Sequence, residues 1–94
     1  MDASELKLAV KTIIVQQEQI IGPLAISEAN KVPGLKVTTD FKTLDVAGDS
    51  KSILTNLARQ YEKLFGKASI EACRESIKEV LPQLPPQDIP EFLR

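Results

Sequence analysis

The sequence predicts an α+β domain that is mainly α-helical, with its elements in the order α-α-β-β-α-α. Four stretches space their apolar residues three or four positions apart, as one face of a helix does. One stretch between them alternates apolar and polar residues, as a half-buried strand does. Glycines at positions 22, 34, 48 and 66 separate these stretches. Because glycine costs about 1 kcal/mol inside a helix relative to alanine, the four glycines indicate element boundaries.

Residues 2–21 are predicted to form the first helix. Asp2 can act as the N-cap, and Glu5 three positions later completes a capping box. Residues spaced four and three apart form a seam along this helix: Leu6, Val10, Ile13, Gln17, Ile20 and Leu24.

Three residues of this first helix are candidate contacts to a partner. Leu8 and Val15 lie off the seam, where a helix of this length can face a second partner. Gln17 lies within the seam, where it can hydrogen-bond to its equivalent in a second copy and set the register of a helix pair. The alternative for Gln17 is an ordinary side chain that faces solvent.

A short helix is predicted next, over 23–32, because proline is favoured at the first helical position. Its candidate buried residues are Leu24, Ala25, Ala29 and Val32. Pro33-Gly34 is typical of a type II turn and ends the helix. Two short strands follow within 35–47 and form a hairpin that turns near 40–42. Its two edges are further candidates for pairing with another chain.

The helix over 50–65 has the clearest pattern. Asp49 or Ser50 can cap it, and Gly66 lies where a helix-ending glycine is favoured. The apolar residues expected to face the core are Ile53, Leu54, Leu57, Ala58, Tyr61, Leu64 and Phe65.

The last helix is predicted over 67–81, with Ser69 as its N-cap and Cys73 as a buried small hydrophobic residue. These elements define one domain over 1–81. The Pro-rich apolar C-terminal segment over 82–94 contains four of the six prolines. It either packs back over the core or serves as a docking tail. Its apolar residues Ile89, Phe92 and Leu93 are therefore candidate interaction residues.

Composition excludes several kinds of chemistry. With no His and a single Cys, the chain has no imidazole base, thiolate zinc site or internal disulfide. A formal charge of −1 gives no excess of positive charge for binding nucleic acid. The longest apolar run is too short to cross a membrane, and the acidic N-terminus is not typical of a secretory signal. We therefore expect a cytoplasmic protein that is not an enzyme and has no cofactor and no metal.

Two groups of polar residues were considered for specific chemistry. Asp40, Asp45 and Asp49 lack the spacing of a calcium loop, and turn and capping roles explain them. Asp49-Ser50 at a helix start is similar to the phosphopantetheine serine of acyl carrier proteins, so an acyl-carrier-like protein modified at Ser50 is one alternative function. A small DNA-binding or antitoxin-type regulator is another, although the Lys and Arg residues are spread evenly along the chain.

The segment Ile20-Ile21-Gly22-Pro23-Leu24-Ala25, with Ala29 later, resembles the "Gly-Pro-x-Ala" element of small helical accessory domains. These domains are appended to bacterial response regulators and serine/threonine kinases. The resemblance implies a signalling or scaffold module and supplies no catalytic motif. Together with the seam and the hairpin edges, it predicts a protein–protein interaction or dimerisation module. The expected partner is a second copy, as a homodimer, or another protein, with no nucleic acid and no membrane.

Overall fold

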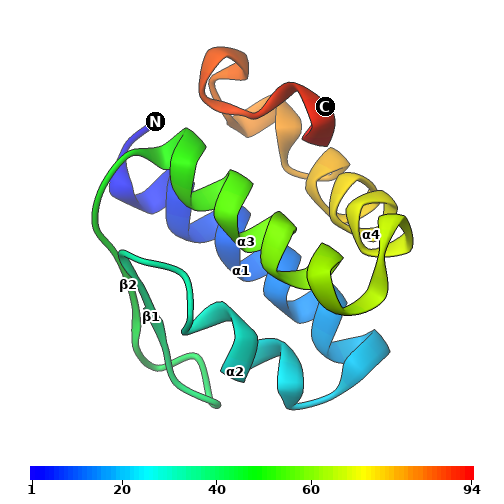
Figure 1. Ribbon diagram of the computed structural model, residues 1–94. Helices are drawn as coiled ribbons and strands as arrows, with labels where there is room; N and C mark the ends of the chain where they lie inside the picture. Colours follow the sequence, from blue (N-terminus) through cyan, green and yellow to red (C-terminus); the bar gives the residue numbers. More distant parts are fainter.

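Four α-helices and a two-stranded antiparallel hairpin follow one another in the predicted order in the computed structural model, which describes residues 1–94 (Figure 1). The elements are α1 (Ala3–Ile21), α2 (Leu24–Ala29), β1 (Leu35–Val37), β2 (Leu44–Val46), α3 (Ser50–Phe65) and α4 (Lys67–Lys78). Three 3₁₀ turns complete the chain: η1 (Leu81–Gln83), η2 (Pro86–Asp88) and η3 (Glu91–Leu93). None of the helices combines the length and apolarity that crossing a bilayer requires.

The helix starts follow the predicted capping residues at α1 and α3 and differ at α2 and α4. The second helix is shorter than the predicted 23–32, because Pro23 is its N-cap and Asn30 already its C-cap. The Asp2 side chain accepts a hydrogen bond from the Glu5 backbone N–H at 2.8 Å. The Glu5 side chain accepts one from the Asp2 backbone N–H at 2.9 Å, so the capping box is confirmed. Asp49 caps α3 by accepting from the Ser52 N–H at 2.9 Å. Ser69 was wrongly predicted as a cap, because α4 already starts at Lys67, directly after Gly66. Ser69 is buried inside that helix.

The core lies between α1, α3 and α4, and α2 and the hairpin close one side of it (Figure 1). The largest fully buried side chains include Ile13, Ile14, Leu54, Leu57, Tyr61 and Ile77. Tyr61 also makes a polar contact, because its hydroxyl donates to the Ala25 carbonyl at 2.7 Å and ties α3 to α2. The predicted apolar stripes thus form the core, except at the C-terminal ends of α1 and α3.

The hairpin is closed along one of its two edges. β1 pairs with β2 so that Leu35 faces Val46, and the backbone groups of Val37 point away from β2. The Asn30 side-chain amide accepts from the Val37 N–H and donates to its carbonyl, both at 2.8 Å. The expectation of two free edges is therefore wrong for β1. Gly34 is required here, because a Cβ at this position would lie 2.0 Å from the Ala47 carbonyl oxygen.

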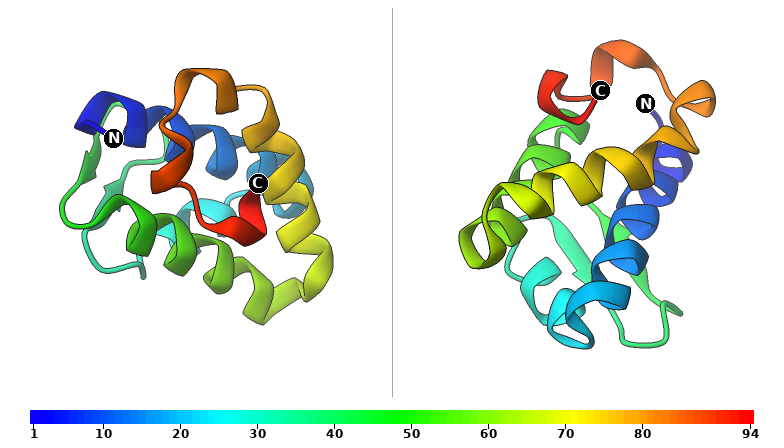
Figure 2. Two further views of the ribbon diagram at one scale, coloured as in Figure 1. Left: turned by 90° about the horizontal axis from the view of Figure 1, so that it is seen from above. Right: turned by 90° about the vertical axis from the view of Figure 1, so that its right-hand side faces the viewer.

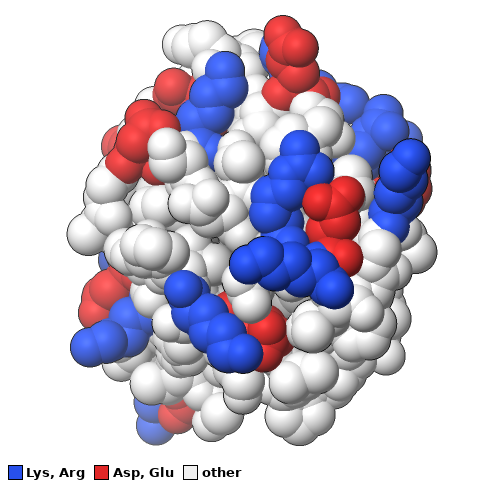
Figure 3. Space-filling model, viewed as in Figure 1, with Lys and Arg blue, Asp and Glu red and all other residues white.

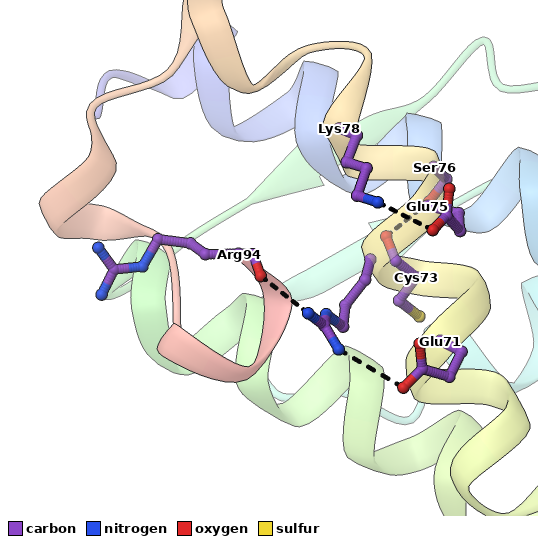
Figure 4. A network of polar contacts seen from close by, with 7 residues as sticks. Glu71, Cys73, Glu75, Ser76, Lys78 and Arg94 are labelled. Atoms are coloured by element: carbon purple, nitrogen blue, oxygen red, sulfur yellow. Dashed lines mark hydrogen bonds and ion pairs between the residues drawn. The ribbon is translucent and has the colours of Figure 1, made fainter.

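The C-terminal segment packs back over the helices (Figure 2). Leu84, Ile89 and Leu93 are buried in the same cluster as the helical core, so residues 82–94 complete the core of the 1–81 domain. Figure 4 shows the polar face of α4 beside this segment. There Arg74 donates to the Arg94 carbonyl oxygen at 3.3 Å, which joins α4 to the end of η3.

Candidate functional site

Leu8 and Val15 line the same groove, between α1 and α4. The groove has a volume of about 550 Å³, and both residues are half-buried in it. Its remaining lining is mainly polar: Lys11, Thr12, Gln16, Gln19, Ser76 and Glu79. The structure therefore brings these two predicted interaction residues together, on a surface where apolar contact is limited to their own side chains.

Gln17 is buried inside the chain instead of facing a partner or solvent. Only 1% of its surface is exposed. Its side-chain amide lies 3.4 Å from the Ser69 carbonyl oxygen and 3.6 Å from the Cys73 sulfur, both on α4. Both interpretations of Gln17 from the sequence are thus corrected. At Gln17 the seam on α1 is covered by α4, and the amide nitrogen donates its hydrogen bonds within the monomer.

The three candidate residues of the C-terminal segment are held within the molecule. Ile89 and Leu93 are fully buried, so their prediction as docking residues is wrong. The physical reason is that the 3₁₀ turns bend the Pro-rich segment back, which removes its apolar side chains from water. Phe92 is half-buried, and the Arg59 guanidinium lies over its ring, 4.5 Å from the centroid. Phe92 therefore anchors this segment to α3.

The groups considered for chemistry have structural roles. Cys73 is fully buried, as predicted, and burial raises the pKa of its thiol to about 12. Asp40 accepts from the Thr38 hydroxyl and the Lys42 N–H in the hairpin turn. Ser50 is the first residue of α3, directly after its cap. Asp45, expected in a turn or cap, is instead exposed on β2.

The exposed large hydrophobic residues all lie beside two helix connections, the one between α1 and α2 and the one between α3 and α4. They are Ile20 (59% exposed), Leu24 (43%), Leu64 (45%) and Phe65 (45%). We call this set the open end. All four had been expected in the seam or the core. A local signal existed, because each lies within two residues of Gly22 or Gly66, where one helix ends and the next begins, and terminal helical turns have fewer neighbours.

Two contacts hold the segments of the open end together. The bond from Tyr61 to Ala25 places the start of α2 beside the last turns of α3. The bond from Gln17 to Ser69 places the end of α1 beside the first turn of α4. The chain reverses in both connections, and Figure 1 shows both on the right-hand side of the molecule. In Figure 3 the lower right, where Figure 1 places the α1–α2 connection, shows no charged side chains.

No family model, curated protein or solved structure matches the chain. The open end consists of exposed apolar side chains on helix ends that the two hydrogen bonds hold in place, and exposed apolar patches often mark interaction sites.

Proposed function

We propose that this protein is a non-catalytic protein-interaction module that forms a homodimer through its open end. The observation that carries the proposal is that all of the exposed large hydrophobic residues, Ile20, Leu24, Leu64 and Phe65, lie beside the α1–α2 and α3–α4 connections, which Figure 1 shows on the same side of the molecule. The largest apolar patch on the surface of a soluble protein is often functional.

The size of the open end supports a weak dimer. Four side chains that are about half exposed present on the order of 400 Å² of apolar surface. A standard interface buries roughly 800 Å² on each partner, so flanking residues must supply the remainder. Pro23 and Ala68 are exposed beside the patch and can do so. The expected complex is therefore reversible, with an interface at the small end of the range for specific contacts.

Charges around the open end are compatible with a twofold arrangement. Lys67 lies at the start of α4, next to Phe65, and Glu18 lies one turn before Ile21 at the end of α1. Because the rim carries both signs, two identical surfaces can meet without placing only like charges opposite each other. The resemblance of the Gly22-Pro23-Leu24-Ala25 segment to bacterial accessory domains supports a role for this dimer in signalling chains.

Sedimentation equilibrium at protein concentrations of about 10–100 μM tests the proposal. We expect a monomer–dimer equilibrium that Phe65→Ser shifts toward monomer. Val15→Ser is the matched control, because it removes an apolar side chain from the α1–α4 groove and leaves the open end intact. A purely monomeric wild type would overturn the proposal. If Val15→Ser dissociated the dimer and Phe65→Ser did not, the interface would lie in the groove instead.

A further inference from the structure

A second surface of the molecule concentrates positive charge. Lysine and arginine are spread evenly along the sequence, but Lys31, Arg59 and Lys63 line one groove between α3 and the turn that follows α2, with a volume of about 400 Å³. The other lining residues are Val32, Pro33, Asn56 and Gln60. In Figure 3 positive side chains gather in the middle of the face that α2 and α3 form. We call this surface the cationic groove.

The carboxylates next to the groove are already occupied. Glu28 is buried, and it accepts from the Gln60 amide at 2.7 Å and from the Lys31 ammonium at 2.8 Å. Glu62 accepts from Arg59 at 2.9 Å. Lys63 has no ion pair and no side-chain hydrogen bond within the chain, so its charge is available to a ligand.

The arginine of the groove is held in place before any ligand arrives. The Phe92 ring lies under the Arg59 guanidinium, and Glu62 binds one of its nitrogens, so the side chain has little freedom left to lose. Asn56, Arg59 and Lys63 are three and four positions apart, which places them on one face of α3. Preorganised donors on a rigid helix reduce the entropic cost of binding an anion.

From this arrangement we propose that the cationic groove binds an acidic peptide segment of a partner protein, with two carboxylates of the segment contacting Arg59 and Lys63. A guanidinium matches the planar geometry of a carboxylate, and residues four apart on a helix lie about 5–6 Å from each other. That distance is close to the spacing of alternate side chains in an extended peptide, about 6–7 Å.

A duplex nucleic acid fits the same groove less well. Three cations and a formal charge of −1 for the whole chain give a small electrostatic contribution, and proteins that bind duplex DNA commonly contact 6–10 phosphates. No aromatic ring is free for stacking at this surface, because Arg59 covers Phe92. This inference does not depend on the homodimer, since the residues involved are not those of the open end.

The test uses the full chain and a fluorescent hexaglutamate peptide as the probe. We expect saturable binding by anisotropy at low salt, with amide shifts at Asn56, Arg59 and Lys63 in NMR spectra. Lys63→Gln should weaken binding roughly threefold or more. Lys7→Gln, an exposed lysine of α1 outside the groove, is the matched control and should leave binding unchanged. Phe65→Ser should also leave it unchanged, which separates this result from the fate of the dimer.

Three results would overturn the proposal. The first is the absence of saturable shifts at the groove, and the second is an equal loss of affinity in the two lysine variants. The third is tighter binding of a competing anion: inorganic phosphate would indicate a site for small anions, and a DNA duplex would indicate a nucleic-acid surface. Binding that is confined to the groove, and strongest for the peptide, would support it.

Discussion

The two ends of the helical assembly carry similar apolar residues, which are buried at one end and exposed at the other. At the end where the N-terminus and the 3₁₀ turns lie, residues 82–94 cover the helices, and Ile89 and Leu93 are fully buried. At the open end nothing in the chain covers Ile20 and Leu64, and about half of each remains exposed. The comparison shows that the amphipathic pattern of a helix selects a face, while a covering segment decides which turns of that face are buried.

The largest expected loss of stability comes from replacing a buried isoleucine at the covered end with alanine. Ile89→Ala should lower the free energy of unfolding by about 2–5 kcal/mol, because it opens a cavity under the 3₁₀ turns. Urea denaturation at low micromolar concentration, where self-association is minor, measures the change. A loss of less than 1 kcal/mol would mean that the C-terminal segment is not part of the core.

Tyr61→Phe tests the interior just beneath the open end. The substitution removes the hydroxyl that donates to the Ala25 carbonyl, and with it the hydrogen bond that ties α3 to α2. We expect a loss of about 0.5–1.5 kcal/mol in the free energy of unfolding. An unchanged urea midpoint would contradict the role of this bond in holding α2 against α3, and with it the fixed arrangement of the open end.

Acid should weaken the side of the molecule formed by α2 and α3. Hydrogen bonds from Lys31 and Gln60 lower the pKa of Glu28 below its ordinary value of 4.5. A lowered pKa means that this carboxylate stabilises the fold above pH 4.5, and that its contribution is lost as pH falls through the lowered pKa. Urea midpoints measured from pH 7 to pH 3 should fall less steeply for Glu28→Gln than for the wild type. Identical slopes would contradict the assignment.

The smallest effect is expected at the open end itself. Ile20→Ala should change the free energy of unfolding by no more than about 0.5 kcal/mol, since the side chain is largely exposed and alanine has the higher helix propensity. The same urea measurement as for Ile89→Ala makes the two isoleucines a matched pair. A loss of unfolding free energy comparable with that of Ile89→Ala would show that Ile20 is covered in the monomer. The two ends would then not differ in burial.

Local signals in the sequence predicted most of the fold. Asp2 with Glu5 and Asp49 start their helices as expected, and Gly22 and Gly66 end theirs. The alternation within 35–47 became a hairpin. These signals act between residues close in sequence, so a single chain reveals them.

The candidate sites were less predictable, because they depend on contacts between distant residues. Gln17 meets α4 across a separation of more than fifty residues, and no pattern near it indicates that. Leu64 and Phe65 continue a perfect apolar stripe, yet α3 extends past the elements that would cover its last turn. The cationic groove combines residues of α3 with residues of the turn between α2 and β1, and neither segment indicates the groove in the sequence. Of the predicted interaction residues, only Leu8 and Val15 share an accessible surface.

The burial of Cys73 gives the molecule an internal reporter of its own motions. It is the only cysteine, it lies where α1 meets α4, and its raised thiol pKa suppresses the reactive thiolate. An alkylating reagent can therefore label it only when the packing of α4 against the core opens, and the labelling rate measures how often that happens. Comparison of the labelling rate with the rate of global unfolding would show whether this packing opens alone or only when the whole chain unfolds.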